Sequence, residues 1–384
     1  MICTSAVVST ADVSFVRILY ILTSLGVGGA EKQVVDLAER MAAKGHAVAI
    51  LVLKHSAEEW PVKLPVMRLN IAKTPLGIAG GLRFARKFLE LFRPDLIHSH
   101  TFPANIFARL LWLMTRAGGR APRLVNTIHN VTEGGWHRMA IYGATDPLVD
   151  RVTAVSTAAA ERFVRLRAVS RHKMDVITNG IDTEVFSPDR NRRKRARIAM
   201  QAGRSFVWIA VGRVVPAKDY PNLLRAFTEV RQAQPAICLW IAGECDVAEW
   251  KTEHGPAEED DGVEVLGLRR DVVDLLDAAD GFVLSSAWEG MPLAVAEAMA
   301  MEKLVVATDV GGVRELVGES GLIVPAKDSP ALAAKMVQAM TMGEMERKIL
   351  GREARKRVAS QFSIAAKAAQ WEKFYTGLIY DKDS

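Results

Sequence analysis

Two glutamates, Glu289 and Glu297, stand eight residues apart around a short turn. The turn follows an apolar segment and precedes one rich in Ala and Met, so the sequence predicts a strand that passes directly into a helix. Pro292 falls where the first helical residue is expected, since a missing N–H breaks no helical hydrogen bond there. Carboxylates placed in this way could accept hydrogen bonds from hydroxyl groups on either side of a bound diphosphate, from a sugar on one side and from ribose on the other.

The predicted helix start is also a candidate anion site. The first-turn N–H groups of Met291 and Leu293 have no helical acceptor, and the positive end of the helix dipole lies at the same place. Gly290 would let a phosphate approach the backbone closely. Glu297 falls on an otherwise apolar helix surface, where a carboxylate needs a partner. The turn therefore predicts a diphosphate held between two acids.

A pair of cations follows an earlier predicted strand at 205–211. Arg213 presents a planar fork and Lys218 a point charge, and both suit a diphosphate. Ordinary surface charge is the alternative interpretation of both residues. Their position after a strand, upstream of Glu289, favours a second part of the same phosphate site.

A glycine-rich turn near the start of the chain is a further candidate phosphate site. An apolar run at 16–22 is followed by Gly28 and Gly29 and then by helical spacing of apolar residues over 30–44, which predicts a strand, a turn and a helix. The glycine spacing departs from the dinucleotide-binding pattern, and the next strand is followed by Lys54 rather than by an acid that could bind ribose. A dehydrogenase is therefore not predicted.

These motifs together resemble those of a known family. The EG-x-P-x4-E arrangement that begins at Glu289, followed by VVATDVGGVREL, is similar to the donor-site signature of the retaining GT-B glycosyltransferases of family four, the group 1 type. The Gly-Arg-x4-Lys segment at 212–218 and the GGAE turn at 28–31 resemble two further elements of that family. The resemblance spans residues 16–380, with departures at 302–304, where the family usually has Gly and Pro.

The resemblance implies an α/β fold of the GT-B type, in which two Rossmann-like domains face one another across a cleft. Residues 1–186 would form the acceptor-binding domain and residues 187–363 the nucleotide-sugar donor-binding domain. Residues 364–384 would form a helix that crosses back to the first domain, and a tail. The length of 384 residues agrees with two domains, since one hydrophobic core rarely serves so long a chain.

The family also implies roles for individual residues. Arg213, Lys218 and the helix start near Glu289 would stabilise the leaving diphosphate, where negative charge grows as the glycosidic bond breaks. Glu289 would bind the sugar and Glu297 the ribose. His129, after a predicted strand, would lie beside the sugar, and a histidine that only stabilises its loop is the alternative. The residues expected to bind the nucleotide sugar are Gly28, Gly29, Gly243, Leu268, Arg269, Gly290, Met291, Pro292, Leu293 and Glu297.

The implied enzyme is a retaining glycosyltransferase, expected to be a hexosyltransferase, that moves a sugar from a nucleotide-diphosphate sugar to a hydroxyl of a sugar or lipid-linked acceptor. Surface polysaccharide, lipopolysaccharide or glycolipid biosynthesis is the expected setting. In this family, retention is ascribed to attack on the face that the diphosphate leaves, so no carboxylate nucleophile is required. A nucleotide-sugar epimerase of the same fold and an inactive nucleotide-sugar-binding protein are the alternatives.

No cofactor and no metal ion are expected. His98 and His100 stand at the end of a predicted strand and could be a metal pair, but we expect alternate strand residues to point to opposite faces, which argues against one shared ion. The three cysteines have no metal-binding spacing and are too few for a disulfide framework, which favours a reducing cytoplasm. Metal-independent transfer is therefore the prediction.

The charge is uneven along the chain. Residues 1–180 hold 23 basic and 13 acidic side chains, whereas residues 181–384 hold 27 and 31. A basic first half with apolar helices at 82–93 and 104–115 could rest on an anionic membrane surface, so peripheral membrane association is a further expectation. No basic patch interleaved with aromatic residues indicates nucleic acid. The basic run at 190–197 is expected to be a solvated linker or helix face.

Overall fold

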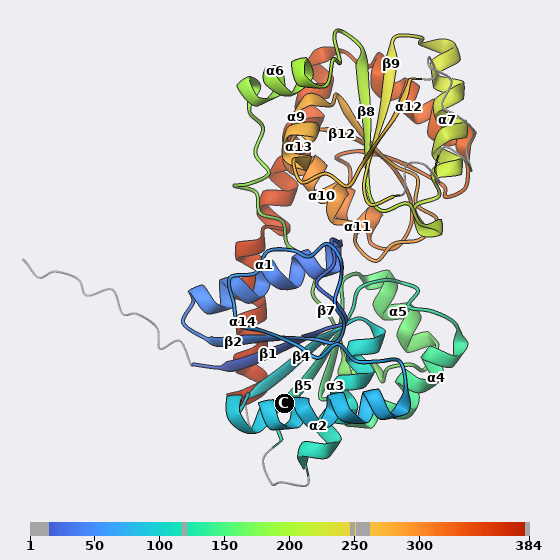
Figure 1. The fold of residues 1–384 in the computed structure, drawn as a ribbon. Helices are drawn as coiled ribbons and strands as arrows, with labels where there is room; N and C mark the ends of the chain where they lie inside the picture. The colour runs from blue at the N-terminus through green and yellow to red at the C-terminus, as the bar shows by residue number, and fades with distance from the viewer. Residues whose placement is uncertain (1–14, 117–120, 246–249, 251–261, 381–384) are drawn as a thin grey trace, which may run out of the picture.

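The computed structural model describes residues 15–116, 121–245, 250 and 262–380. Cys3 lies outside these ranges. Two parallel β-sheets, one in each half of the chain, form two domains that Figure 1 shows one above the other. Helices flank both sheets, so the predicted α/β architecture of two Rossmann-like domains is confirmed.

The N-terminal sheet has seven strands in the order β3-β2-β1-β4-β5-β6-β7. Its central strands are apolar runs that are buried along almost their whole length, as expected for a parallel sheet covered on both faces. The register places Leu22 opposite His100 and His100 opposite Thr127, so three strands end side by side. The strands are β1 (Arg17–Leu22), β2 (Ala47–Val52), β3 (Val66–Arg68), β4 (Leu96–His100), β5 (Arg123–Ile128), β6 (Arg151–Ala154) and β7 (Met174–Val176).

Two helical layers cover this sheet. One layer combines α1 with α14, which comes from the end of the chain and runs along the N-terminal domain in Figure 1. The other layer contains α2 to α5. The helices are α1 (Gly29–Ala43), α2 (Pro75–Phe92), α3 (Phe102–Arg116), α4 (Trp136–Thr145), α5 (Thr157–Arg165) and α14 (Ile364–Tyr380), with short 3-10 helices at Asp146–Leu148 and Arg171–Lys173.

The C-terminal sheet has six strands in the order β10-β9-β8-β11-β12-β13. Helices α7 and α12 pack on one face, and the other helices of this domain pack on the opposite face. The strands are β8 (Phe206–Val211), β9 (Ile237–Ala242), β10 (Val263–Gly267), β11 (Gly281–Leu284), β12 (Leu304–Thr308) and β13 (Leu322–Val324). The helices are α6 (Arg190–Ala199), α7 (Tyr220–Ala233), α9 (Val272–Ala278), α10 (Leu293–Ala300), α11 (Val313–Val317), α12 (Ser329–Thr341) and α13 (Glu344–Gln361).

Helix α2 starts two turns earlier than the apolar pattern at 82–93 predicts. It begins at Pro75, and the Thr74 side chain caps it by accepting a hydrogen bond from the Gly77 N–H at 3.1 Å. Proline in the first turn after a threonine cap is a strong start for a helix. Glycines at Gly77 and in the next turn interrupt the apolar spacing, which explains why the pattern hides this first part.

The basic run at 190–197 is a helix rather than a linker, so the helix-face alternative of that expectation holds, but several of its cations are paired instead of solvated. The run forms α6, which packs against α9. Arg193 Nη1 donates to the carbonyl oxygens of residues 277–279 at the end of α9, and Arg192 pairs with the Asp277 carboxylate. Cations at a helix C-terminus satisfy its last carbonyls and interact favourably with its dipole. The charges therefore hold α6 to the C-terminal domain.

Candidate active site

The loop before α10 lies directly against the N-terminal domain. Asn130 and Gly290 form an antiparallel bridge, and a β-carbon at Gly290 would overlap the carbonyl group of His129. Asn179 Nδ2, also from the N-terminal domain, donates to the Met291 carbonyl at 3.1 Å. Gly290 permits a close approach, and the approaching group in this structure is the backbone of the other domain.

Helix α10 begins at Leu293, and Pro292 is its N-cap residue. The expected first helical position of Pro292 is wrong by one residue, because its ψ of 114° is extended rather than helical. Within the described residues, the N–H groups of Met291 and Leu293 have no hydrogen-bond acceptor. These amides and the helix dipole give the start of α10 a partial positive charge.

Lys218 and Glu289 form an ion pair beside this helix start. Lys218 Nζ lies 2.6 Å from Glu289 Oε1, and Ser286 Oγ donates to the same oxygen at 2.8 Å. A short 3-10 helix, Pro216–Lys218, places Lys218 after β8. Arg213 is exposed in the same connection. The two expected cations and the first expected acid therefore come from neighbouring strand ends of one sheet.

Glu297 lies within α10 and interacts with Lys32 of α1, in the other domain. Burial raises the pKa of Glu297, and attraction to Lys32 opposes the rise. Burial lowers the pKa of Lys32, but attraction to Glu297 and Asp36 outweighs burial, so that pKa is raised. Lys32 also forms an ion pair of 2.7 Å with Asp36. Lys32 is thus the partner that a carboxylate on an apolar helix requires. We did not identify Lys32 from the sequence, although it directly follows the GGAE turn.

The glycine-rich turn brings the start of α1 to the start of α10. Gly28 is the N-cap residue of α1, and a β-carbon at Gly29 would lie 3.4 Å from Leu293 Cδ1. In the first turn of α1, burial raises the pKa of Glu31, and attraction to Arg213 is among the effects that lower it. Two helix N-termini, one from each domain, therefore meet close to the cation Arg213.

Gly243, Leu268 and Arg269 follow β9 and β10. A β-carbon at Gly243 would overlap the carbonyl group of Gly212, so a glycine is required where these two connections touch. Two hydrogen bonds bind the Arg269 guanidinium to the Asp271 carboxylate. The charge of Arg269 is therefore already paired within its own loop.

His129 follows β5, and its surroundings keep the ring neutral. The Nε2 of its ring lies 2.9 Å from His100 Nδ1. The backbone N–H of His129 donates to Glu133 Oε1 at 3.0 Å. Burial lowers the pKa of His129 to about 4. Burial, and then the nearby rings of His98 and His129, hold the pKa of His100 well below its usual value. A neutral imidazole of this kind can donate one hydrogen bond and accept another.

His98 and His100 point to the same face of β4, so the expectation of opposite faces was wrong. Residues two apart share a face of a strand, and the two ring centroids are 4.0 Å apart. The nitrogens of His98 already have partners, the Tyr375 hydroxyl at 2.7 Å and the Thr127 hydroxyl at 2.6 Å. Among the described residues, no three His, Cys, Asp or Glu side chains are arranged to hold a metal ion. His98 is a structural link between the sheet and α14.

Glu133 is a titratable neighbour of His129 that we did not identify from the sequence. Its Oε2 accepts a hydrogen bond from the Tyr142 hydroxyl at 2.7 Å. Burial raises the pKa of Glu133 to about 7, although the hydrogen bonds from Tyr142 and His129 and attraction to Arg138 lower it. A glutamate in a loop gives no indication of such burial in the sequence. The structure therefore adds a group that changes charge near neutral pH beside His129.

Two family models match the chain, one over each domain. The Glycosyltransferase Family 4 model matches residues 27–185, and the Glycosyl transferases group 1 model matches residues 205–342. The chain belongs to the family 4, group 1 glycosyltransferases. The predicted family and the prediction of an enzyme are therefore confirmed.

Relatives of this glycosyltransferase agree with that assignment. The chain is 24% identical to the UDP-Gal:alpha-D-GlcNAc-diphosphoundecaprenol alpha-1,3-galactosyltransferase of Escherichia coli, over 77% of this chain and 79% of that protein. It is 26% identical to the putative glycosyltransferase EpsD of Bacillus subtilis (strain 168), over 77% and 80%. The crystal structure of Anabaena Alr3699/HepE in complex with UDP-glucose has a TM-score of 0.81 at 20% identity, covering 94% of this chain and 100% of that one. The predicted GT-B fold is confirmed.

In this glycosyltransferase, most of the expected site residues converge between the two domains. Those that meet there are Gly28, Gly29, His129, Arg213, Lys218, Glu289, Gly290, Met291, Pro292, Leu293 and Glu297. Gly243 joins them through its contact with Gly212, next to Arg213. Leu268 and Arg269 follow β10, which is two strands away from β8.

Proposed function

We propose that this enzyme transfers a hexose from a nucleotide-diphosphate sugar to an acceptor hydroxyl, with retention at the anomeric carbon and without a metal ion. The start of α10 carries the proposal. Its unpaired amides lie beside Lys218 and meet the start of α1 from the other domain. Free N–H groups, two helix N-termini and a cation are the features that bind a diphosphate.

The same groups would stabilise the transition state. As the bond from the anomeric carbon to the diphosphate oxygen breaks, negative charge grows on the diphosphate, and Arg213, Lys218 and the amides at the start of α10 stabilise it. The acceptor oxygen bonds to the anomeric carbon on the same face, and its proton passes to the departing diphosphate oxygen. No protein carboxylate is consumed, so Glu289 is free to bind the sugar and Glu297 the ribose.

The names of two relatives support a lipid-linked acceptor and a polysaccharide product. The Escherichia coli relative is named for transfer to a GlcNAc-diphosphoundecaprenol, and a Staphylococcus aureus relative is named CapM, a capsular polysaccharide biosynthesis glycosyltransferase. We therefore propose that the reaction belongs to surface polysaccharide or glycolipid assembly, in the cytoplasm at the inner face of the membrane.

Helix α2 supports contact with such a surface. Its packed face carries the buried residues Ala85 and Leu89, and the opposite side exposes Leu76 and Leu91 by 86% and 81%. The exposed Lys87 lies on the same outer side. Apolar side chains with interleaved cations are typical of a helix that lies on an anionic lipid surface. Among the described residues, no helix combines the length and the apolar character of a membrane span.

A panel of nucleotide sugars tests the activity. The protein is heated with each compound, and the one that binds raises the unfolding temperature, since ligand at 100 times its dissociation constant adds about 2.7 kcal/mol of stability. That nucleotide sugar is then incubated with a polyprenyl-diphosphate-linked sugar. We expect nucleotide release that depends on the acceptor and, by NMR, a product with the anomeric configuration of the starting sugar.

The controls separate the alternatives. Conversion of the nucleotide sugar without an acceptor would identify an epimerase and contradict transfer. An inverted product would contradict retention, and loss of transfer on treatment with EDTA would contradict metal independence. Lys218→Ala should lower kcat/KM at least tenfold, which is about 1.4 kcal/mol. Lys335→Ala, which removes a partly exposed lysine of α12 that hydrogen-bonds to Gln338, should not change it.

A further inference from the structure

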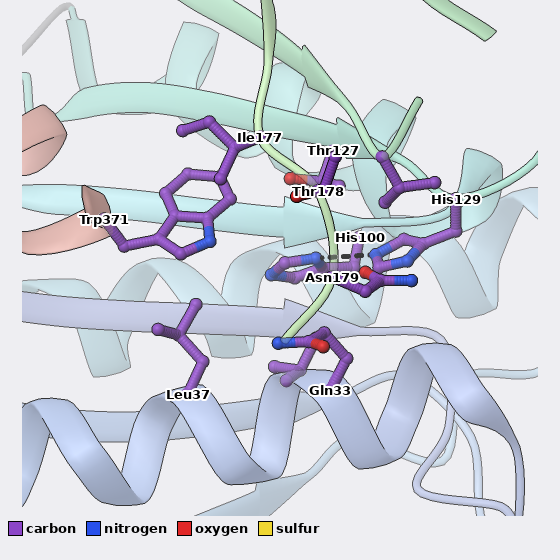
Figure 2. Close-up of a pocket in the computed structure, with 11 residues that line it drawn as sticks. Gln33, Leu37, His100, Thr127, His129, Ile177, Thr178, Asn179 and Trp371 are labelled. Carbon is purple, nitrogen blue, oxygen red and sulfur yellow. Dashed lines mark hydrogen bonds between the residues drawn. The ribbon is translucent and has the colours of Figure 1, made fainter. Parts of the chain in front are cut away.

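A small cavity lies beside the pair of His100 and His129, inside the N-terminal domain. Its volume is about 10 Å³. Apolar side chains of Leu37, Ile177 and Trp371 close it on several sides, and Figure 2 shows these residues around the His100 ring. A space of this size is close to the ~10–15 Å³ that one water molecule requires.

Three buried polar atoms without a hydrogen-bond partner belong to residues that line this one cavity. They are Gln33 Nε2, His100 Nε2 and Thr178 Oγ1. The second polar atom of Gln33 and of His100 does have a partner. Gln33 Oε1 accepts from the Gly180 N–H at 2.8 Å, and His100 Nδ1 pairs with His129. Buried polar atoms are nearly always hydrogen-bonded, so three without a partner at one site of this size indicate a missing bridging molecule.

We propose that one ordered water fills this cavity, hydrogen-bonded to Gln33, His100 and Thr178, and that His100 is thereby the positioning residue that fixes the tautomer of His129. A water that makes about three hydrogen bonds is the usual occupant of a polar buried space. The two rings lie within hydrogen-bond distance, so one of the two facing nitrogens carries a proton and the other accepts it.

The donors and acceptors among the three unpaired atoms determine which of the two histidines donates the hydrogen bond between them. Gln33 Nε2 can only donate, so the water oxygen accepts from it. The two hydrogens of the water then need two acceptors, and the unpaired atoms of the cavity provide Thr178 Oγ1 and His100 Nε2. A neutral His100 that accepts at Nε2 carries its proton on Nδ1 and donates it to His129 Nε2. His129 consequently carries its own proton on Nδ1.

If His129 Nε2 instead donated to His100 Nδ1, one hydrogen of the water would have no partner. In that arrangement, His100 Nε2 and Gln33 would both donate to the water, and Thr178 would be the only acceptor among the unpaired atoms. A buried hydrogen without an acceptor is rarer than an unused lone pair. The burial that lowers the pKa values of His100 and His129 keeps both rings neutral, so a defined tautomer exists near neutral pH.

This arrangement also connects His129 to the segment that joins the domains. Gln33 holds Gly180 in place, and Asn179 donates to the carbonyl of Met291 in the loop before α10. The water therefore links α1, the 178–180 segment and the ring of His100, which in turn bonds to His129. The consequence for catalysis rests on the proposed function: His129 would present an Nδ1–H donor to an oxygen of the nucleotide sugar.

NMR of the unliganded protein tests the tautomers directly. Protein labelled with ¹⁵N-histidine should show His129 and His100 both protonated at Nδ1 at pH 7.5, because protonated and unprotonated ring nitrogens have well separated shifts. A high-resolution crystal structure should show a single water within hydrogen-bond distance of the three atoms. An Nε2-protonated or cationic His129, or an empty cavity, would overturn the proposal. Neither measurement needs enzymatic activity, so both would still test the tautomers and the water if the proposed function were wrong.

Two substitutions of His100 test the positioning role. Asn can place an amide N–H near the position of Nδ1, whereas Leu has a similar size and no donor. We expect His100→Asn to keep kcat within about threefold of the unchanged enzyme and His100→Leu to lower kcat at least tenfold with little change in KM. His129 in the Leu variant should show both tautomers by NMR. Equal kcat values in the two variants, with His129 still protonated only at Nδ1, would contradict the role of His100.

Discussion

Gly290 and His129, one from each domain, are close enough for their backbones to touch. A β-carbon on Gly290 would overlap the His129 carbonyl group, and the next residue, Asn130, pairs with Gly290 in an antiparallel bridge. The loop that starts α10 and the loop that carries His129 therefore keep a fixed distance only while position 290 has no side chain. This contact sets the separation between the candidate diphosphate site and the histidine.

Gly290→Ala should separate these two loops. Because the overlapping atoms are backbone, the clash is relieved only if a domain or a loop moves, and a displacement of the reacting groups by about 1 Å can cost about 100-fold in rate. We expect kcat/KM to fall at least tenfold while circular dichroism and thermal unfolding show a folded protein. Gly343→Ala is the matched control, since nothing lies within 4 Å of a β-carbon at that position. Equal losses in both variants would contradict this explanation.

Lys32→Met should weaken nucleotide-sugar binding in a pH-dependent way. Attraction to Lys32 counteracts the rise that burial causes in the pKa of Glu297, so removing the cation raises this pKa further. Protonated Glu297 cannot accept hydrogen bonds from both ribose hydroxyls. The dissociation constant, measured by calorimetry, should therefore rise most at low pH and recover as the pH increases. Lys44→Met, which breaks an ion pair with Glu372 at the other end of α1, should leave binding unchanged at every pH.

Glu289→Gln should separate binding of the sugar from binding of the nucleotide. Glu289 is paired with Lys218 at 2.6 Å in this structure, and a diphosphate would compete for the same ammonium group. Loss of the carboxylate charge frees Lys218 for the diphosphate but removes an acceptor for sugar hydroxyls. We expect free nucleoside diphosphate to bind as tightly as before or more tightly, and transfer to fall at least tenfold. Weaker binding of the free diphosphate would assign Glu289 to the nucleotide instead.

The parts of the site that are local in sequence were predictable. A strand, a glycine and a helix in direct succession determine where amides are left unpaired, so the turn at Gly290 could be identified from spacing, whereas Lys218 was identified with the help of the resemblance to the Gly-Arg-x4-Lys element. The one-residue error at Pro292 is of the size that helix ends usually show. The succession of strands and helices indicated α/β structure, whereas the arrangement in two Rossmann-like domains came from the family resemblance.

Roles that depend on packing between distant segments were not predictable. Lys32 matters because α10 of the other domain places Glu297 beside it, and Glu133 matters because Tyr142 and His129 enclose it. The acceptors of Arg193 are backbone carbonyls of α9, which no side-chain pattern displays. The error at His98 had a different origin, since side chains two residues apart on a strand always share a face.

The stability of the protein should depend on Glu133 between about pH 4.5 and pH 7. Burial raises the pKa of Glu133 in the folded protein to about 7 from its ordinary value of 4.5, so the folded protein binds more protons than the unfolded chain in this interval. Stability from this group is therefore present below pH 4.5 and decreases as the pH rises to 7. Glu133→Gln should remove the decrease, on the order of 2 kcal/mol after allowance for partial exposure.

Denaturant unfolding of Glu133→Gln and the unchanged protein, at pH 5 and pH 8, measures this effect. Both proteins retain the buried histidines, whose lowered pKa values reduce stability in acid, so the difference between the two curves isolates residue 133. The variant should gain stability relative to the unchanged protein at pH 8 and much less at pH 5. A difference that is independent of pH would show that the carboxyl does not titrate in this range.

Membrane binding should depend on the outer face of α2. Partial burial of Leu76 and Leu91 in lipid would contribute on the order of 1.5 kcal/mol each, and Lys87 would add about 1 kcal/mol near an anionic surface. Leu76→Ser with Leu91→Ser should therefore lower partitioning to anionic vesicles at least tenfold in a sedimentation assay. Ile198→Ser, which replaces an exposed apolar residue of α6 in the other domain, is the matched control and should have no effect. Equal partitioning of the unchanged protein to neutral and anionic vesicles would rule out an electrostatic contribution to membrane binding. If the double variant bound anionic vesicles as well as the unchanged protein, the membrane contact would lie elsewhere on the molecule.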